Sequence, residues 1–340
     1  MANDSLKIDV YTHVLPEEYG RRMFELLPKV ENQTLSSFFY RSVDLDRSPL
    51  LSDIPRRLRE MESVGDGYRQ VLTLAAPQIE DFAQPPVGTE LSRLANDGMA
   101  ALVADHPERF VGFAAQLAMN DPDAAVAELE RALALPGALG VQIPSRIGGR
   151  PIDHPDFEGV IAKVAEHDAA IWIHPNRSPT MPDYEGEELS YYHLFISIGW
   201  PYDTSLAVGR LIFSGIMERY PNLKVIVHHA GGMIPSYAHR IGYERAAVDK
   251  GRTDRAALTK PPVEYLRRLY ADTAMRLNPA AVRLAIDFFG PEHVLFGTDT
   301  GFAHDPSVLI AELEGLGLPE ADEQLIFSGN AQRIFPLVNV

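Results

Sequence analysis

A chain of 340 residues with 46% hydrophobic residues and no cysteine is long enough to bury a large core without disulfides. Its 31 basic and 47 acidic residues give a formal net charge of −16, which disfavours nucleic acid and anionic membranes as partners. Without cysteine there is no thiolate nucleophile, and any metal must bind to His, Asp, Glu or Tyr. The N-terminal residues lack the apolar run of a secretory signal, and no apolar stretch approaches about 18 residues, so we expect a cytoplasmic protein.

Predicted strands and helices alternate along most of the chain. The strands begin near residues 7, 68, 110, 137, 169, 224, 270 and 293. Helices are predicted over residues 55–64, 89–106, 122–133, 157–167, 205–220 and 279–289, and two more close the chain. Residues 14–53 predict a long loop with irregular helix, and residues 176–200, rich in Pro, Tyr and Gly, predict a second insertion.

This alternation predicts an α/β fold, a (β/α)₈ TIM barrel that occupies residues 1–340 as a single domain. The two insertions would follow strands one and five. A doubly wound open sheet is the weaker alternative, because no Gly-x-Gly-x-x-Gly motif follows the first strand.

The run Lys224–Gly232, with sequence Lys-Val-Ile-Val-His-His-Ala-Gly-Gly, is typical of a strand that carries catalytic groups. Its apolar residues predict a buried parallel strand that presents polar side chains at its C-terminal end. Because successive strand residues point to opposite faces, we expect only one of His228 and His229 to face the site. The other would pack against its surroundings.

Four predicted strand ends carry possible metal ligands, namely His13, His174, His229 and Asp299. In a barrel these ends open on the same face. Imidazole nitrogens with one carboxylate suit Zn²⁺, with Mn²⁺ or Fe²⁺ as alternatives. A single strand-end histidine is more often structural, and an aspartate in this position can cap a turn. The occurrence of all four together favours a metal centre.

The chain resembles the amidohydrolase superfamily. This resemblance rests on Tyr11-Thr12-His13, His174, His229-Ala230-Gly231-Gly232 and Phe296-Gly297-Thr298-Asp299. Two further segments, Gly199-Trp200-Pro201-Tyr202-Asp203-Thr204-Ser205 and Glu218-Arg219-Tyr220-Pro221, resemble one branch of it. That branch contains amino-carboxymuconate-semialdehyde decarboxylase and the hydroxybenzoate decarboxylases.

The resemblance implies one divalent metal, Zn²⁺ or Mn²⁺, with the ligands His13, His174 and Asp299. It also implies that His229 is the acid/base group and that His228 is a structural neighbour. Arg240 matches an arginine that can reach across a dimer interface to a substrate carboxylate, so we expect a homo-oligomer, either a dimer or a tetramer. A surface salt bridge is the alternative role for Arg240.

The first strand departs from the family pattern, because Tyr11 occupies the first position of the usual His-x-His or Glu-x-His. Tyr11 and His13 are two residues apart and share a face of the strand. The phenol could coordinate the metal as phenolate or donate a hydrogen bond to substrate. Alternatively, metal binding is weaker in this chain. The fourth strand end, Val141-Gln142-Ile143, has no lysine, which excludes the dimetal form with a carbamylated lysine.

The second insertion supplies aromatic residues, among them Trp200, which could line a pocket for a planar ring or serve only in packing. Its other aromatic or imidazole side chains are Tyr191, Tyr192, His193 and Phe195. Three arginines of the insertions are possible anion contacts: Arg41, Arg47 and Arg177.

The leading hypothesis is a metal-dependent non-oxidative decarboxylase, a carboxy-lyase, that acts on an aromatic or ring-cleavage carboxylic acid. His229 and Asp299 would manage the proton that replaces carbon dioxide. One alternative is a hydrolase or hydratase that cleaves a ring-fission product with metal-activated water. Another is a metal-free barrel that binds a small molecule. Carbon dioxide release, label uptake from water and elemental analysis distinguish the three.

Overall fold

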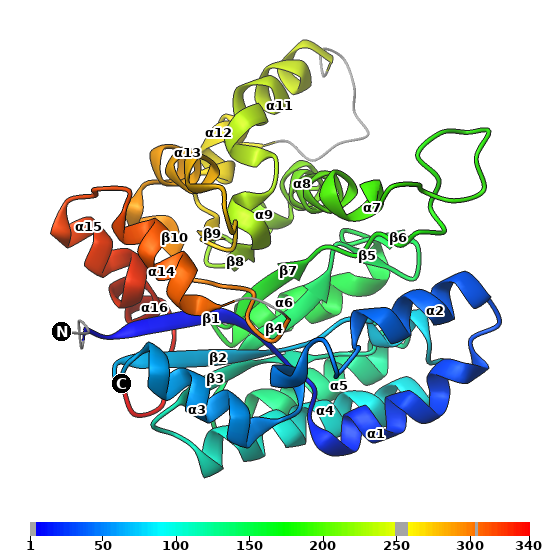
Figure 1. Ribbon diagram of the computed structural model, residues 1–340. Helices are drawn as coiled ribbons and strands as arrows, with labels where there is room; N and C mark the ends of the chain where they lie inside the picture. Colours follow the sequence, from blue (N-terminus) through cyan, green and yellow to red (C-terminus); the bar gives the residue numbers. More distant parts are fainter. Residues whose placement is uncertain (1–4, 249–257, 303–304) are drawn as a thin grey trace.

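The computed structural model describes residues 5–248, 258–302 and 305–340, with the backbone alone for residues 243–248. Its central feature is a parallel sheet curled into a barrel and covered by helices (Figure 1). The eight strands follow the order β1-β2-β3-β4-β7-β8-β9-β10, and each neighbouring pair is parallel. This order confirms the predicted (β/α)₈ TIM barrel.

Every barrel strand begins within one residue of its predicted position. The strands are β1 (Lys7–Val14), β2 (Tyr68–Leu74), β3 (Phe110–Gln116), β4 (Ala138–Pro144), β7 (Ala170–His174), β8 (Lys224–Val227), β9 (Tyr270–Asp272) and β10 (Val294–Leu295). A small antiparallel hairpin of β5 (Arg146–Ile147) and β6 (Arg150–Pro151) follows β4.

The outer layer consists of helices that connect successive strands or follow the last strand. They are α3 (Ile54–Val64), α4 (Val87–Asp105), α5 (Pro122–Leu133), α6 (Glu158–Glu166), α8 (Gly199–Phe213), α9 (Ile216–Arg219), α11 (Ile234–Val248), α12 (Pro262–Leu266), α13 (Pro279–Phe289), α14 (Pro306–Glu314), α15 (Glu320–Gln324) and α16 (Asn330–Ile334). The side chains of Asp53, Asp121 and Asn278 accept hydrogen bonds from the first turns of α3, α5 and α13. A proline follows shortly after each cap, so the N-termini of these three helices can be predicted from the sequence.

The first insertion differs from the prediction, because it contains two regular helices instead of a loop with irregular helix. These are α1 (Glu17–Leu26) and α2 (Gln33–Ser42). Tyr19, Met23 and Leu27 are spaced four apart and bury one face of α1 in a separate apolar cluster. Each helix has only ten residues, so its periodicity is too short to stand out between the prolines that flank it.

The second insertion also ends earlier than predicted. Residues 194–197 form the short helix α7 (Leu194–Ser197), and α8 begins at Gly199, within the predicted insertion. The helix predicted over residues 205–220 is therefore two helices, α8 and α9. They are separated at Gly215, which has a positive φ of 82°.

Large apolar side chains fill the inside of the barrel. Trp172 lies there with Val71 and Ile226, and its indole N–H donates to the carbonyl of Val10 across the barrel, at 3.0 Å. Phe335, beyond α16, stacks on Trp172 with ring centres 5.0 Å apart. The C-terminal strand ends, where barrel enzymes place their sites, lie beyond this apolar packing.

Single backbone hydrogen bonds close the barrel between β1 and the segment after β10. The amide of Val10 donates to the carbonyl of Phe296 at 2.9 Å, and the amide of Asp299 donates to the carbonyl of Tyr11 at 3.0 Å. Farther along, the amide of His13 donates to the carbonyl of Thr300 at 2.5 Å. This closure places His13 beside Asp299, although they are far apart in the sequence.

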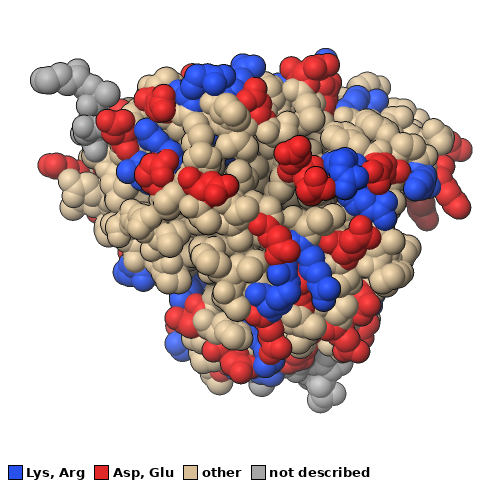
Figure 2. All heavy atoms as spheres, turned by 90° about the horizontal axis from the view of Figure 1, so that it is seen from below, with Lys and Arg blue, Asp and Glu red and all other residues tan. Residues whose placement is uncertain are grey.

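Within the described residues, none of the helices combines the length and the apolar character needed to cross a membrane. Figure 2 shows acidic and basic side chains intermingled on one face of the molecule, without a continuous basic surface among the residues drawn in colour there.

Candidate active site

The chain turns sharply at the end of β8, and both histidines of the turn face the same site. β8 ends at Val227, and His229 and Ala230 have positive φ angles of 58° and 54°. The rings of His228 and His229 lie 3.7 Å apart. The prediction that only one of them faces the site is wrong, because the alternation of side chains requires extended strand and the strand has already ended.

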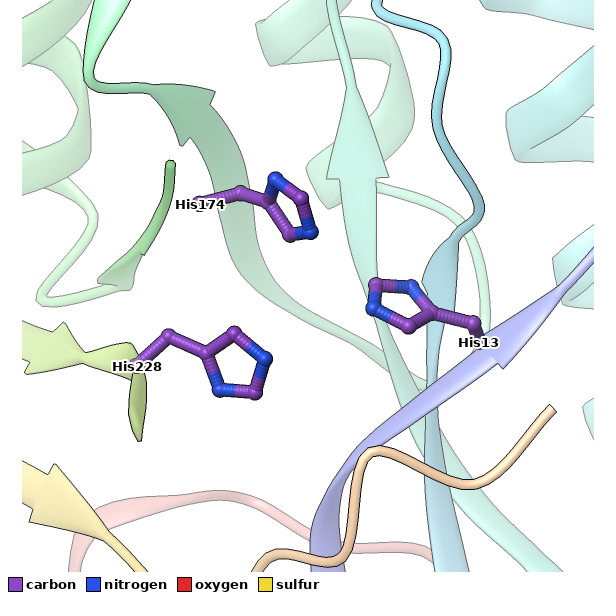
Figure 3. Close-up of side chains that lie close together, drawn as sticks. All are labelled: His13, His174 and His228. Carbon is purple, nitrogen blue, oxygen red and sulfur yellow. The ribbon is translucent and has the colours of Figure 1, made fainter. Parts of the chain in front are cut away.

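A cluster of imidazoles lies at the C-terminal end of the barrel. Nitrogen atoms of His13, His174 and His228 are within 4.8 Å of one another. Figure 3 shows these rings converging from β1, from the end of β7 and from the residue after β8. His228 and His229 also form a second group with Asp299 within the same distance. His228 belongs to both groups, so the sequence reasoning missed a central residue.

The spacing of the donor atoms fits a small cation. Nε2 of His13 lies 3.1 Å from Oδ1 of Asp299, and Nε2 of His228 lies 3.5 Å from the same oxygen. Ligands that bind one Zn²⁺ at about 2.0–2.2 Å are about 3.0–3.5 Å from one another. The two Nε2 atoms are buried and make no hydrogen bond within the described residues, as expected of nitrogens placed to bind a metal.

The second nitrogen of each ring fixes the tautomer. Nδ1 of His13 lies 3.1 Å from the carbonyl of Leu74, and Nδ1 of His174 lies 2.7 Å from the carbonyl of Pro175. Because a carbonyl only accepts hydrogen bonds, each Nδ1 carries the proton and each Nε2 keeps its lone pair. Burial, reinforced by the neighbouring imidazoles, lowers the pKa of His174 well below its usual value, so this ring is neutral.

A buried carboxylate orients His228. Nδ1 of His228 donates to Asp272 at the end of β9, and the other oxygen of Asp272 accepts from the amides of Ala230 and Ala274 at 3.1 and 3.0 Å. Burial alone would lower the pKa of His228, but Asp272, helped by Asp299, raises it to about 9. A metal ion at Nε2 would take the place of the second proton on this ring.

His229 has the opposite electrostatic setting. Burial, followed by the proximity of His228, lowers the pKa of His229 to about 3. Its Nδ1 is buried without a hydrogen-bond partner in the described residues. This neutral ring can accept a proton. Trp200 lies beside it, with its ring centre 6.1 Å from that of His229 and 5.8 Å from that of His174.

Tyr11 lies inside the cluster as a neutral phenol. Its ring stacks on His228 with centres 3.6 Å apart and planes 10° apart, and its oxygen is buried without a hydrogen-bond partner in the described residues. Burial, followed by the negative charges of Asp272 and Asp299, raises the pKa of Tyr11 well above its usual value. A protonated phenol is a poor metal ligand and a good donor, which favours the hydrogen-bonding alternative.

The structure does not bring the other predicted residues into the cluster. Arg240 is exposed on α11. Arg41 and Arg47 are exposed on the first insertion, and Arg177 lies 3.7 Å from the carboxylate of Asp203. Among the aromatic residues of the second insertion, Phe195 packs against Phe38 of α2, whereas three are exposed: Tyr191, Tyr192 and His193.

Comparisons with known proteins agree with this geometry. The chain is 28% identical to the 2-amino-3-carboxymuconate-6-semialdehyde decarboxylase of Dictyostelium discoideum, over 96% of this chain and 90% of that protein. The crystal structure of 5-carboxyvanillate decarboxylase from Sphingomonas paucimobilis superposes with a TM-score of 0.82 at 28% identity, covering 98% of this chain and 99% of that one. A dihydroxybenzoic acid decarboxylase from a Polaromonas species, with manganese and the inhibitor 2-nitroresorcinol bound, superposes with a TM-score of 0.77 at 26% identity, covering 97% of each chain.

The family model described as Amidohydrolase matches residues 8–337. This match runs from β1 to the residues that follow α16 and so includes every strand of the barrel. It confirms the resemblance drawn from the strand-end motifs. The chain therefore belongs to the amidohydrolase family.

Proposed function

We infer that this protein is a divalent-metal-dependent carboxy-lyase that removes carbon dioxide, without oxidation, from an aromatic or ring-cleavage carboxylic acid. The observation that carries this inference is the buried group of imidazoles around Asp299, in a chain whose relatives are decarboxylases of such acids. A bound divalent cation supplies positive charge that stabilises the negative charge developing as the carbon–carbon bond breaks.

For the metal, we propose the ligands His13, His174 and Asp299, with Nε2 of His228 as a further donor. Three imidazole nitrogens and one carboxylate suit Zn²⁺. Mn²⁺ is the alternative, and it is the ion bound in the Polaromonas enzyme. The hydrogen bonds at Nδ1 of each histidine support this assignment, because they keep the Nε2 lone pairs directed at one another.

For the chemistry, we propose that His229 delivers the proton that replaces carbon dioxide. When the bond to the carboxyl carbon breaks, its electron pair stays on the substrate carbon, which then takes up one proton. Because the ring of His229 is neutral, it would first take this proton from water and then pass it to the substrate carbon. Tyr11 would donate a hydrogen bond to a substrate oxygen, and Trp200 would form one wall for the planar substrate.

For the assembly, we propose a homo-oligomer in which Arg240 binds the substrate carboxylate of a neighbouring subunit. Among the described residues, seven of the eleven exposed large hydrophobic side chains lie between residues 184 and 237, which makes this region the best candidate for an interface. Tyr202 and Leu206 share one face of α8, and Tyr237 lies one turn before Arg240 on α11. An arginine at such an interface is suited to a planar carboxylate.

The activity can be tested with protein freed of metal and reloaded with either Mn²⁺ or Zn²⁺. Candidate substrates are 5-carboxyvanillate, dihydroxybenzoates and 2-amino-3-carboxymuconate-6-semialdehyde, and the measurement is carbon dioxide release. We expect release from at least one acid, dependent on added metal. Uptake of ¹⁸O from water into the product without release of carbon dioxide would instead establish a hydrolase or hydratase.

A further inference from the structure

Two glutamines point into the barrel at the ends of neighbouring strands. Gln142 on β4 is in register with Gln116 on β3 and with Trp172 on β7. Residues in register on parallel strands share a face of the sheet. Because Trp172 lies inside the barrel, Gln142 and Gln116 point inward as well. His174 lies two residues beyond Trp172, so Gln142 is just below the level of the imidazole cluster.

Hydrogen bonds fix the orientation of the Gln142 amide. Its Nε2 donates to the carbonyl of Leu74 and to Oε1 of Gln116, both at 3.2 Å. Nε2 of Gln116 donates in turn to Oε1 of Gln78, at 3.2 Å. The carbonyl of Leu74 only accepts, so the NH₂ group of Gln142 must face it and the amide cannot flip.

The amide of Gln142 adjoins the proposed metal site through one shared atom. The carbonyl oxygen of Leu74 that accepts from Gln142 also accepts from Nδ1 of His13, at 3.1 Å. The Gln142 side chain and the His13 ring are therefore neighbours across a single oxygen. Gln142 thus lies next to the Nδ1 side of the His13 ring, at the edge of the imidazole cluster.

Oε1 of Gln142 is an unused acceptor. Gln142 is 1% exposed, and Oε1 has no hydrogen-bond partner among the described residues. A buried carbonyl without a donor destabilises the protein. The hydrogen bonds that link the amides of Gln142, Gln116 and Gln78 prevent this oxygen from turning toward another donor. An acceptor held in this way beside a catalytic centre is typical of a site completed by its ligand.

We propose that Oε1 of Gln142 accepts a hydrogen bond from a hydroxyl or amino group on the substrate. Acids with such a donor beside the carboxylate that leaves are the ones named for the relatives, and Gln142 is the residue that would recognise the donor. An analogue with a methyl ether in that position leaves Oε1 buried and unpaired, so it is rejected. Gln142 is a specificity-determining residue and takes no part in bond breaking. This inference rests on the proposed function.

The test compares pairs of probes that differ by one donor. The probes are 2,3-, 2,4- and 2,6-dihydroxybenzoate, each with the monomethyl ether that keeps one hydroxyl beside the carboxylate. Dissociation constants are measured by calorimetry on metal-loaded protein, and kcat/KM is measured wherever turnover occurs. The variants are Gln142→Met and Gln142→Leu, which remove the acceptor. Gln70→Met is the matched control, because Gln70 is equally buried but holds Arg57 and Tyr68 instead.

The wild type is expected to prefer at least one dihydroxybenzoate over its ether by about tenfold or more. In Gln142→Met and Gln142→Leu this preference should fall to about twofold or less, with metal content unchanged. Gln70→Met should keep the wild-type preference. Equal binding of every pair by the wild type, or an unchanged preference in both Gln142 variants, would overturn the inference. Loss of the preference in binding, in a protein that decarboxylates nothing, would refute the proposed function but retain the role of Gln142.

Discussion

Two adjacent imidazoles at the end of β8 differ widely in proton affinity, and the hydrogen bond of one of them to a buried carboxylate contributes to the difference. His228 has Asp272 at its Nδ1 and a pKa raised to about 9, whereas burial and the proximity of His228 lower the pKa of His229 to about 3. Pairs of titratable groups whose surroundings push their pKa values apart are a mark of divided chemical roles. The pair is consistent with one ring oriented for ligation and the other free to move a proton.

These separate roles predict that a variant of His228 loses metal affinity, whereas the matched variant of His229 loses turnover. His228→Asn should lower metal affinity by about 10- to 100-fold, because it removes a donor and the partner of a buried carboxylate. His229→Asn should keep its metal and lose about 10²–10⁴ in kcat. Elemental analysis and steady-state kinetics on both proteins provide the measurement. Equal loss of metal from the two variants, or full turnover by His229→Asn, would contradict the assignment.

At the scale of elements, the closure between β1 and β10 depends on a buried side chain as well as on backbone. β10 has only two residues, and Asp9 of β1 compensates by accepting from the amide of Thr298 at 3.0 Å and from its hydroxyl at 2.5 Å. The hydroxyl of Tyr68 also donates to Asp9, at 2.6 Å. Although these bonds oppose it, burial raises the pKa of Asp9 to about 7.

The raised pKa of Asp9 predicts a pH dependence of stability. Between its usual value of 3.8 and about 7, the folded state binds the Asp9 proton more tightly than the unfolded state does. The contribution of Asp9 to stability is thus complete at low pH and declines as the pH rises through 7. In metal-free protein, the difference in Tm between Asp9→Asn and the wild type should shift in favour of the variant from pH 5 to pH 8. A difference that is constant over this range would refute the prediction.

Local sequence patterns predicted most strands and helices, but they did not predict the contacts that form the site. Buried strands and capped helices were predictable because apolar runs, Asp or Asn caps and early prolines act over a few residues. The role of His228 was not predictable, because it depends on β8 ending at Val227, before both histidines, and on the left-handed turn that follows. Gln116 and Gln142 did leave a signal: each is a buried polar residue at an inward position of an otherwise apolar strand. The network that holds them depends on Leu74 and Gln78, which only the assembled barrel brings near.

At the scale of the whole molecule, the exposed apolar side chains of α8 and α11 predict a subunit interface. Sedimentation velocity should give a mass at least twice that of the 37.7 kDa chain. If Arg240 acts across the interface, Arg240→Ala and His229→Asn should each be nearly inactive alone. Mixing them under conditions of subunit exchange should then restore up to about a quarter of wild-type activity, because a mixed dimer contains one intact site.

A monomer in sedimentation would contradict the interface. An active Arg240→Ala protein, or a mixture without recovery despite demonstrated exchange, would instead contradict the role of Arg240 while leaving the interface intact. Tyr237→Ala on the same face of α11 is a useful companion variant. It should weaken association without removing any charged group from the proposed site.

The joining of β1 to the segment after β10 also has a consequence for biosynthesis. One proposed ligand, His13, leaves the ribosome long before another, Asp299. Chains fold as they emerge, from the N-terminus onward. A nascent polypeptide therefore exposes separate, incomplete sets of donors until Asp299 has emerged and the segment after β10 has joined β1. Loading with metal should accordingly follow the emergence of Asp299 from the ribosome.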